Sequence, residues 1–313
     1  MATHSVKSYR RAPSPLPLMA RAAVSGTPGL SSIPGIRRAG RDLPNLVVRS
    51  RDQSIDLEHL ADYSRLCGFG LKATVPVTYP HILAFGLQLA LLTDLRFPFP
   101  ALGLVHIHNS ITQHRPLRTS EPLDLEVWAA NLRPHRRGRQ FDVITTATIA
   151  GSVVWEECTT LLRRGVDHPR DTAGRPDPLP VGQVEWRLPA DLGRRYAAVS
   201  GDYNPIHLYG ITARAFGFQR PIAHGMWSLA RCLAELDGRL PDGYTMEAAF
   251  SKPILLPAKV AYATTMRGEL VRFALTDASE CTPHVGGTIT PSAIAGTCER
   301  GTDQRSDGPS RGT

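Results

Sequence analysis

The stretch Tyr196-Ala-Ala-Val-Ser200-Gly-Asp-Tyr-Asn-Pro-Ile-His207 concentrates polar side chains that can handle protons. Asp202 and His207 lie five positions apart in it, with Pro205 between them. On a helix this spacing would turn the two side chains about 140° apart, whereas in a proline-containing loop they can converge. A carboxylate beside an imidazole can take a proton from a water or a substrate near neutral pH and return it. The sequence therefore predicts acid–base chemistry at this loop.

A second motif, Ile222-Ala-His-Gly-Met226, stands where an apolar helical pattern begins. The free N–H groups and the dipole at a helix N-terminus favour a developing negative charge, and Gly225 lets a ligand approach the backbone. Asn204 adds an amide that can hold a water. Together these groups suit proton abstraction next to a thioester carbonyl. Taken alone, Asp202 would equally fit a turn, because Gly-Asp-x-Asn-Pro favours turns, and His224 would fit packing or capping.

Hydrophobic patterning divides the chain into two series of elements with the same order. Residues 78–95 are apolar almost all round, which predicts a buried helix, and 225–240 predict a second, mostly apolar helix. Shorter helices are predicted at 56–67 and 189–199. Strand patterns occupy 46–48, 104–112, 123–130, 140–150 and 152–163 in the first series, and 246–250, 259–266, 268–276 and 284–290 in the second.

The repeat is also visible in the residues. The segment Tyr63-Ser-Arg-Leu-Cys-Gly68 stands where Tyr196-Ala-Ala-Val-Ser-Gly201 stands in the second half, and the strand leading to Pro116 matches the one leading to Pro253. One buried helix wrapped by a curved antiparallel sheet, formed twice, is the economical architecture. We therefore expect an α+β fold in which the two sheets protect each other's edges.

Composition excludes several classes of protein. The net charge of +8 is confined to the N-terminus, because residues 1–41 carry seven Lys or Arg and no acid, which leaves +1 for the remainder. A nucleic-acid-binding domain would need its charge on a folded face together with a reading motif, and neither is present. The five cysteines lack any CxxC pair, which argues against a zinc site or a disulfide framework and favours a reducing compartment. We therefore expect a cytoplasmic protein, and no apolar run approaches the roughly 20 residues of a membrane span.

The predicted domain boundaries follow these shifts in composition. Residues 1–42 are rich in Ser, Pro, Gly and Arg and are interpreted as a disordered basic tail, although a targeting segment or a misassigned start would also fit. The first unit covers 43–163, a Pro- and Gly-rich linker 164–182, and the second unit 183–290. Residues 291–313 are expected to form a flexible tail.

The segment Ser200-Gly-Asp-Tyr-Asn-Pro-Ile-His207, followed by Gly217-Phe218 and Ile222-Ala-His-Gly-Met226, resembles the signature of the MaoC-like, or (R)-specific, enoyl-thioester hydratases. The two-unit layout is similar to mycobacterial-type (3R)-hydroxyacyl-thioester dehydratases, which have a double hotdog fold. Segments such as Pro76-Val-Thr-Tyr-Pro80, Ile111-Thr-Gln-His-Arg-Pro116 and His135-Arg-Arg-Gly138 strengthen this closer match. The resemblance covers about 43–290.

The resemblance implies residue roles. Asp202 and His207 would act on one catalytic water, Asn204 would help to position it, and the Gly225 N–H would hold the thioester oxygen. Substrate contacts are expected from Ser200, Gly201, His224, Met226 and, in the first half, Tyr79. No metal or redox cofactor is implied, since the substrate carries CoA or acyl-carrier phosphopantetheine, and a homodimer is conceivable.

The first half departs from the pattern. In place of Asp202 to His207 it has Phe69-Gly-Leu-Lys-Ala-Thr74, without a carboxylate or an imidazole, and is predicted to be catalytically silent. In relatives this loss goes with a sheet opened for a long acyl chain. Two alternatives stay open: a hotdog acyl-thioesterase, and a non-catalytic subunit that binds acyl thioesters. Chain length, carrier and pathway are not given by the sequence.

Overall fold

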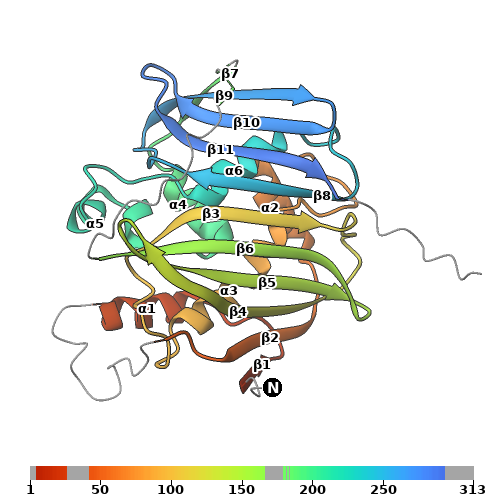
Figure 1. Cartoon of the computed structure of the whole chain (residues 1–313), viewed down its shortest axis with the longest axis vertical. Helices are drawn as coiled ribbons and strands as arrows, with labels where there is room; N and C mark the ends of the chain where they lie inside the picture. Colours follow the sequence, from red (N-terminus) through yellow and green to blue (C-terminus); the bar gives the residue numbers. More distant parts are fainter. Residues whose placement is uncertain (1–4, 27–41, 166–178, 181, 183, 293–313) are drawn as a thin grey trace, which may run out of the picture.

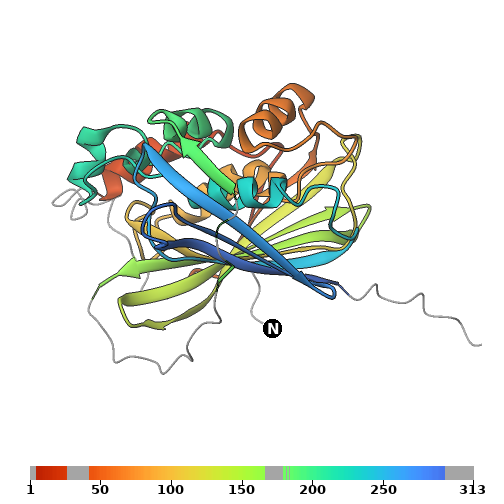
Figure 2. The ribbon, with the colours of Figure 1, turned by 90° about the horizontal axis from the view of Figure 1, so that it is seen from above.

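The computed structural model describes residues 5–26, 42–165, 179–180, 182 and 184–292. Its strands form one 11-stranded sheet with the order β1-β2-β4-β5-β6-β3-β8-β11-β10-β9-β7. The sheet curves around the helices, which gather on its concave face (Figures 1 and 2). This is the α+β double hotdog fold that the sequence predicts.

The first half pairs five strands with two helices. These are β2 (Leu46–Gln53), α2 (Leu57–Cys67), α3 (Tyr79–Leu92), β3 (Leu104–Gln113), β4 (Leu123–His135), β5 (Gly138–Ile149) and β6 (Ser152–Arg164).

The second half adds short helices before its central one. Its elements are β7 (Val184–Leu188), α4 (Leu192–Ser200), the 3-10 helix η2 (Pro205–His207), α5 (Gly210–Ala215), α6 (Gly225–Ala234), β8 (Tyr244–Phe250), β9 (Ala258–Arg267), β10 (Leu270–Asp277) and β11 (Pro283–Pro291).

The two halves have the same topology. In each, the first strand lies next to the third, followed by the fourth, the fifth and then the second. The two second strands, β3 and β8, pair antiparallel in register His108↔Ala249 to Gln113↔Tyr244, and so join the halves into one sheet. This pairing protects what would otherwise be two exposed sheet edges.

The core lies between the sheet and the two central helices. All but two residues of α3 are buried, as its all-round apolar sequence predicts. Helix α6 ends at Ala234, earlier than the predicted 240, and Gly238 follows with φ +80°, which a helix cannot continue. Strand β7 was not predicted from the sequence, because only its last residue is buried and the alternation is weak.

The prediction of a disordered tail over 1–42 is wrong for residues 5–26. Strand β1 (Ser5–Tyr9) pairs parallel with β2, and helix α1 (Pro15–Gly26) packs on α3. Pro15 and Pro17 are compatible with this helix, because both lie in its first turn, where N–H groups have no intrahelical partner. Met19 and Ala22 are buried against Leu89 and Leu102.

Several boundary predictions lie partly outside the described residues. Most of the predicted linker 164–182 and nearly all of the predicted tail 291–313 lie outside the described residues. Among the described residues, no helix combines the length and the apolar character needed to cross a bilayer.

Candidate active site

The predicted catalytic loop begins where α4 ends. Gly201 caps the helix with φ +73°, a left-handed conformation that glycine adopts without strain. The Asp202 N–H donates to Ser200 Oγ at 3.1 Å, and the Asn204 N–H donates to Asp202 Oδ1 at 3.1 Å. These bonds turn the chain sharply, so that Asp202 and His207 converge as predicted from the proline-containing spacing.

His207 is held in one tautomer by the backbone. Its Nδ1 lies 2.7 Å from the carbonyl oxygen of Ile222, which can only accept, so Nδ1 carries the hydrogen and Nε2 the lone pair. Burial lowers the pKa of His207, although the nearby Asp202 charge and the bond to Ile222 oppose the shift. At neutral pH the ring is therefore uncharged and can accept a proton.

His224 stacks on His207, with ring centroids 3.6 Å apart and planes 24° apart. Its Nε2 donates to the Asp202 carbonyl oxygen at 3.0 Å and lies 3.7 Å from Asp202 Oδ2. Burial, and then the neighbouring His207, hold the pKa of His224 well below its usual value. The contact with Asp202 is therefore a polar contact of a neutral ring rather than an ion pair, and it fixes the loop against the start of α6.

Gly225 is the first residue of α6 and is half-buried. Its N–H stands at the helix N-terminus, where backbone donors lack intrahelical partners. A Cβ at this position would lie 3.1 Å from Phe250 Cε1, so any side chain would crowd the site. The geometry suits an oxyanion site beside Asp202 and His207.

The other predicted residues have varied surroundings. Asn204 caps the start of η2, and its side-chain oxygen lies 3.5 Å from the Ile206 backbone nitrogen. Ser200 accepts from the loop, and Gly201 is the helix cap. Met226 is buried in the hydrophobic core. The roles predicted for these residues stay predictions.

Tyr79 lies at the start of α3 rather than in the catalytic loop, and is buried. Its hydroxyl lies 2.8 Å from His59 Nδ1, and His59 Nε2 lies 2.7 Å from the carbonyl oxygen of Val199 in α4. This chain of bonds connects the first half to the helix that carries the catalytic loop. By helix start, Tyr79 corresponds to Gly225 in the second half.

Two contacts of the loop were missed by the sequence reasoning. A Cβ on Gly193 would lie 2.0 Å from the His207 carbonyl oxygen, so α4 needs a glycine there for the loop to pass. A Cβ on Gly201 would lie 2.6 Å from Pro15 Cγ, which places the start of α1 against the catalytic loop. The glycine in an otherwise helical pattern was the available signal for the first contact.

Asp202, His207 and His224 present ligand atoms that all lie within 4.8 Å of one another, the one such group of three among the described residues. His224 donates through Nε2, which leaves its lone pair on Nδ1. The prediction that the enzyme uses no metal stays a prediction.

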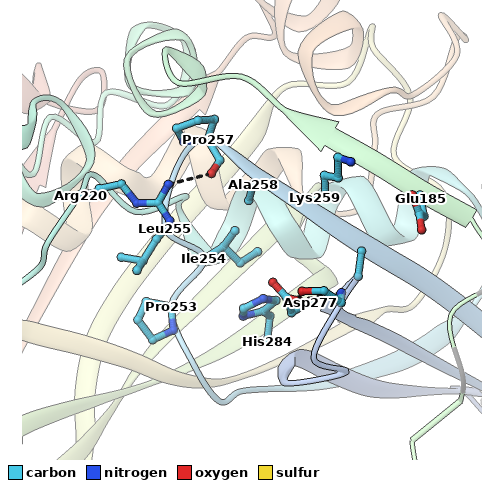
Figure 3. A pocket seen from close by; sticks show the side chains of 12 residues that line it. Glu185, Arg220, Pro253, Ile254, Leu255, Pro257, Ala258, Lys259, Asp277 and His284 are labelled. Carbon is cyan, nitrogen blue, oxygen red and sulfur yellow. Dashed lines mark hydrogen bonds between the residues drawn. The ribbon is translucent and has the colours of Figure 1, made fainter.

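A separate cavity of about 440 Å³ lies beside the segment that follows β8 (Figure 3). Arg220, Lys259 and His284 line it together with Asp277 and Glu185, so its charges are mixed. It adjoins the segment before α6, because the Ala223 N–H donates to the carbonyl oxygen of Ile254, one of its lining residues.

The MaoC like domain family matches residues 171–278. The chain is 39% identical over 225 residues to 3-hydroxyacyl-thioester dehydratase X of Mycobacterium tuberculosis, a match that covers 69% of this chain and 79% of the relative. It belongs to the MaoC-like dehydratase family. The crystal structure of HtdX from the same organism superposes with a TM-score of 0.71 at 34% identity, over 79% of this chain and all of that one.

Membership in this family makes the protein an enzyme of the hydro-lyase type. The fold alone would not establish the reaction. An acyl-ACP thioesterase from Bacteroides thetaiotaomicron has the same fold, with a TM-score of 0.53 at 8% identity, over 78% of this chain and 97% of that one.

Proposed function

We propose that the protein reversibly hydrates trans-2-enoyl thioesters to (3R)-3-hydroxyacyl thioesters. The observation that carries the proposal is the convergence of a carboxylate, a neutral imidazole with its lone pair on Nε2, and a glycine at a helix N-terminus. The 39% identity to a 3-hydroxyacyl-thioester dehydratase supports the same reaction class.

The reaction balances with one water and these groups. Asp202 and His207 Nε2 take a proton from the water, whose oxygen bonds to C3 of the enoyl group. The C2–C3 π electrons move toward the thioester carbonyl, and the Gly225 N–H stabilises the oxygen as it gains charge. The proton held by the pair then passes to C2 on the same face, so the addition is syn. Dehydration is the reverse, and no metal or redox cofactor is needed.

In this proposal the acyl chain of the substrate is carried by either CoA or acyl-carrier phosphopantetheine. The reaction class implies a role in fatty-acid metabolism, and the predicted reducing, cytoplasmic compartment fits it.

Incubation with crotonyl-CoA and with decenoyl-CoA tests the reaction. We expect the enoyl-thioester absorbance to fall without release of free thiol, and chiral analysis to identify the (3R) product. Release of thiol, measured with a thiol reagent, would instead identify a thioesterase. Saturable binding without turnover would identify a non-catalytic acyl-thioester-binding subunit. Either of these outcomes contradicts the proposal.

A further inference from the structure

A line of half-buried residues leads from the oxyanion position into the silent half. The Phe250 ring lies against Gly225, and the His106 ring packs on Phe250 with centroids 4.6 Å apart. Gly225, Phe250 and His106 are all half-buried, whereas Met246 and Ala248, which precede Phe250 on the inward face of β8, are buried. This line is therefore partly accessible to solvent, unlike the adjoining core.

His106 offers a hydrogen-bond acceptor on this line. Its Nε2 lies 3.1 Å from the carbonyl oxygen of His108, which can only accept, so Nε2 carries the hydrogen. Burial, and then His81, lower the pKa of His106 to about 3, so the ring is neutral at physiological pH with its lone pair on Nδ1. Among the described residues Nδ1 has no hydrogen-bond partner, and it is not one of the fully buried unpaired atoms, so it keeps some exposure.

Behind His106 lies a buried polar cluster centred on the Glu157 carboxylate. His81 Nδ1 lies 2.9 Å from both carboxylate oxygens of Glu157, and Asn109 Nδ2 donates to Glu157 Oε1 at 2.8 Å. Burial alone would raise the pKa of Glu157, but His81, Asn109 and His106 outweigh it and leave it lowered. This end of the line is therefore polar rather than apolar. Asn109 Oδ1 also lacks a hydrogen-bond partner, but it is a fully buried atom, whereas His106 Nδ1 is not.

We propose that His106 is a specificity-determining residue whose Nδ1 accepts a hydrogen bond from a hydroxyl, or another donor, on the acyl chain beyond the reacting carbons. The inference rests on the proposed hydration of enoyl thioesters and names its preferred substrates. A plain alkyl chain along the same line would cover Nδ1 without giving it a partner. A buried acceptor left unpaired costs enough to reduce kcat/KM by roughly 10- to 100-fold.

Matched pairs of substrates test this preference. The probes are trans-2-hexenoyl-, octenoyl- and decenoyl-CoA, each compared with its ω-hydroxylated counterpart. For at least one length we expect kcat/KM to be about 10-fold or more higher for the hydroxylated member. A ratio at or below one for all three lengths would overturn the proposal. This comparison uses the wild-type protein and does not depend on any variant.

Variants of His106 test whether its Nδ1 atom causes the difference in kcat/KM between the hydroxylated and the plain substrates. His106→Leu removes the acceptor and should bring the ratio to one or below, whereas His106→Asn keeps a side-chain acceptor and should retain part of the preference. His114→Leu is the matched control, because His114 directly follows the same strand but is exposed and pairs with Glu156 at 2.8 Å. An unchanged ratio in His106→Leu, or the same change in His114→Leu, contradicts the assignment.

Separate measurements distinguish a failure of the proposed hydration from a failure of the proposed preference for hydroxylated acyl chains. Crotonyl-CoA turnover by the wild-type protein tests the reaction, since this substrate is too short to carry the distal group. Calorimetric Kd values for octanoyl-CoA and 8-hydroxyoctanoyl-CoA test the preference without turnover. Tighter binding of the hydroxylated ligand that is lost in His106→Leu would support the role of His106 even in a protein that does not hydrate.

Discussion

The two halves of the chain share one topology but differ in the loop before the central helix. Helices α2 and α4 both end at a glycine in the left-handed conformation, Gly68 with φ +87° and Gly201 with φ +73°. Ten residues then lead to α3, whereas 23 lead to α6 and include η2 and α5. The fold therefore needs only the short connection, and the longer one holds the acid–base groups.

The difference extends into the helix before the loop. Eight residues before the capping glycine, α2 has Leu60, which is buried in the core, whereas α4 has Gly193. The backbone of His207 lies where a side chain at Gly193 would stand. The second half thus lacks a core side chain at this position, and the space is filled by the catalytic loop. The second half therefore differs from the first in the helix before the loop as well as in the loop itself.

The largest effect is expected from removing the proton-transfer groups. Asp202→Asn and His207→Ala should each lower kcat for crotonyl-CoA by about 10²- to 10⁴-fold, because general acid–base catalysis contributes that much. Steady-state kinetics and circular dichroism measure the loss and the fold. Thr74→Ala in the silent loop is the control and should change kcat little. Full activity in either catalytic variant would remove the distinction between the halves.

The sequence predicted the repeat, the order of the central elements and the convergence of Asp202 with His207, because these depend on local periodicity and turn chemistry. It did not predict that α1 packs on α3, since Met19 and Ala22 are buried through contacts with residues far away in the chain. Nor could it place His106 beside Phe250, because that contact depends on β3 and β8 lying next to each other. Contacts across the repeat need the three-dimensional register.

Gly193→Ala tests whether the close approach of α4 to the His207 backbone is needed for catalysis. The new Cβ would displace the His207 backbone, and a misplacement of about 1 Å can lower kcat by roughly 10²-fold. Leu60→Ala in the matching position should instead lower the free energy of unfolding by about 2–5 kcal/mol through a cavity, with kcat nearly unchanged. Urea unfolding and kinetics on both variants measure this. If Gly193→Ala kept full kcat, the close approach would have no catalytic consequence.

Met19→Asp tests whether the N-terminal helix supports the fold. Loss of the buried Met19 contact with α3 should lower the free energy of unfolding by about 1.5–3 kcal/mol. A smaller decrease in kcat should accompany it, because Pro15 of the same helix lies against Gly201. Leu16→Asp is the control, since Leu16 is 59% exposed on α1. Equal effects of the two substitutions would show that α1 does not dock through Met19.

Acid should destabilise the protein through its buried neutral histidines. Because burial lowers the pKa values of His207 and His224, the unfolded chain binds protons below pH 6.5 that the folded chain does not. As the pH is lowered, the free energy of unfolding should therefore decrease, by up to about 1.4 kcal/mol per pH unit for each histidine. His224→Asn should flatten the decrease measured by urea unfolding between pH 7 and 5. A slope unchanged by this substitution would contradict the lowered pKa of His224.

The smallest effect is expected in the silent loop. Lys72 forms an ion pair with Asp237 at 2.8 Å, but the two side chains are 43% and 28% exposed. Such a pair contributes about 0.2–1 kcal/mol, so Lys72→Ala should change the free energy of unfolding by no more than this. It should leave the kcat for crotonyl-CoA within about twofold, because the loop of this half holds no carboxylate or imidazole for proton transfer. A loss of kcat comparable to that of Asp202→Asn would mean that the short loop takes part in the chemistry, and the assignment of one active half would be wrong.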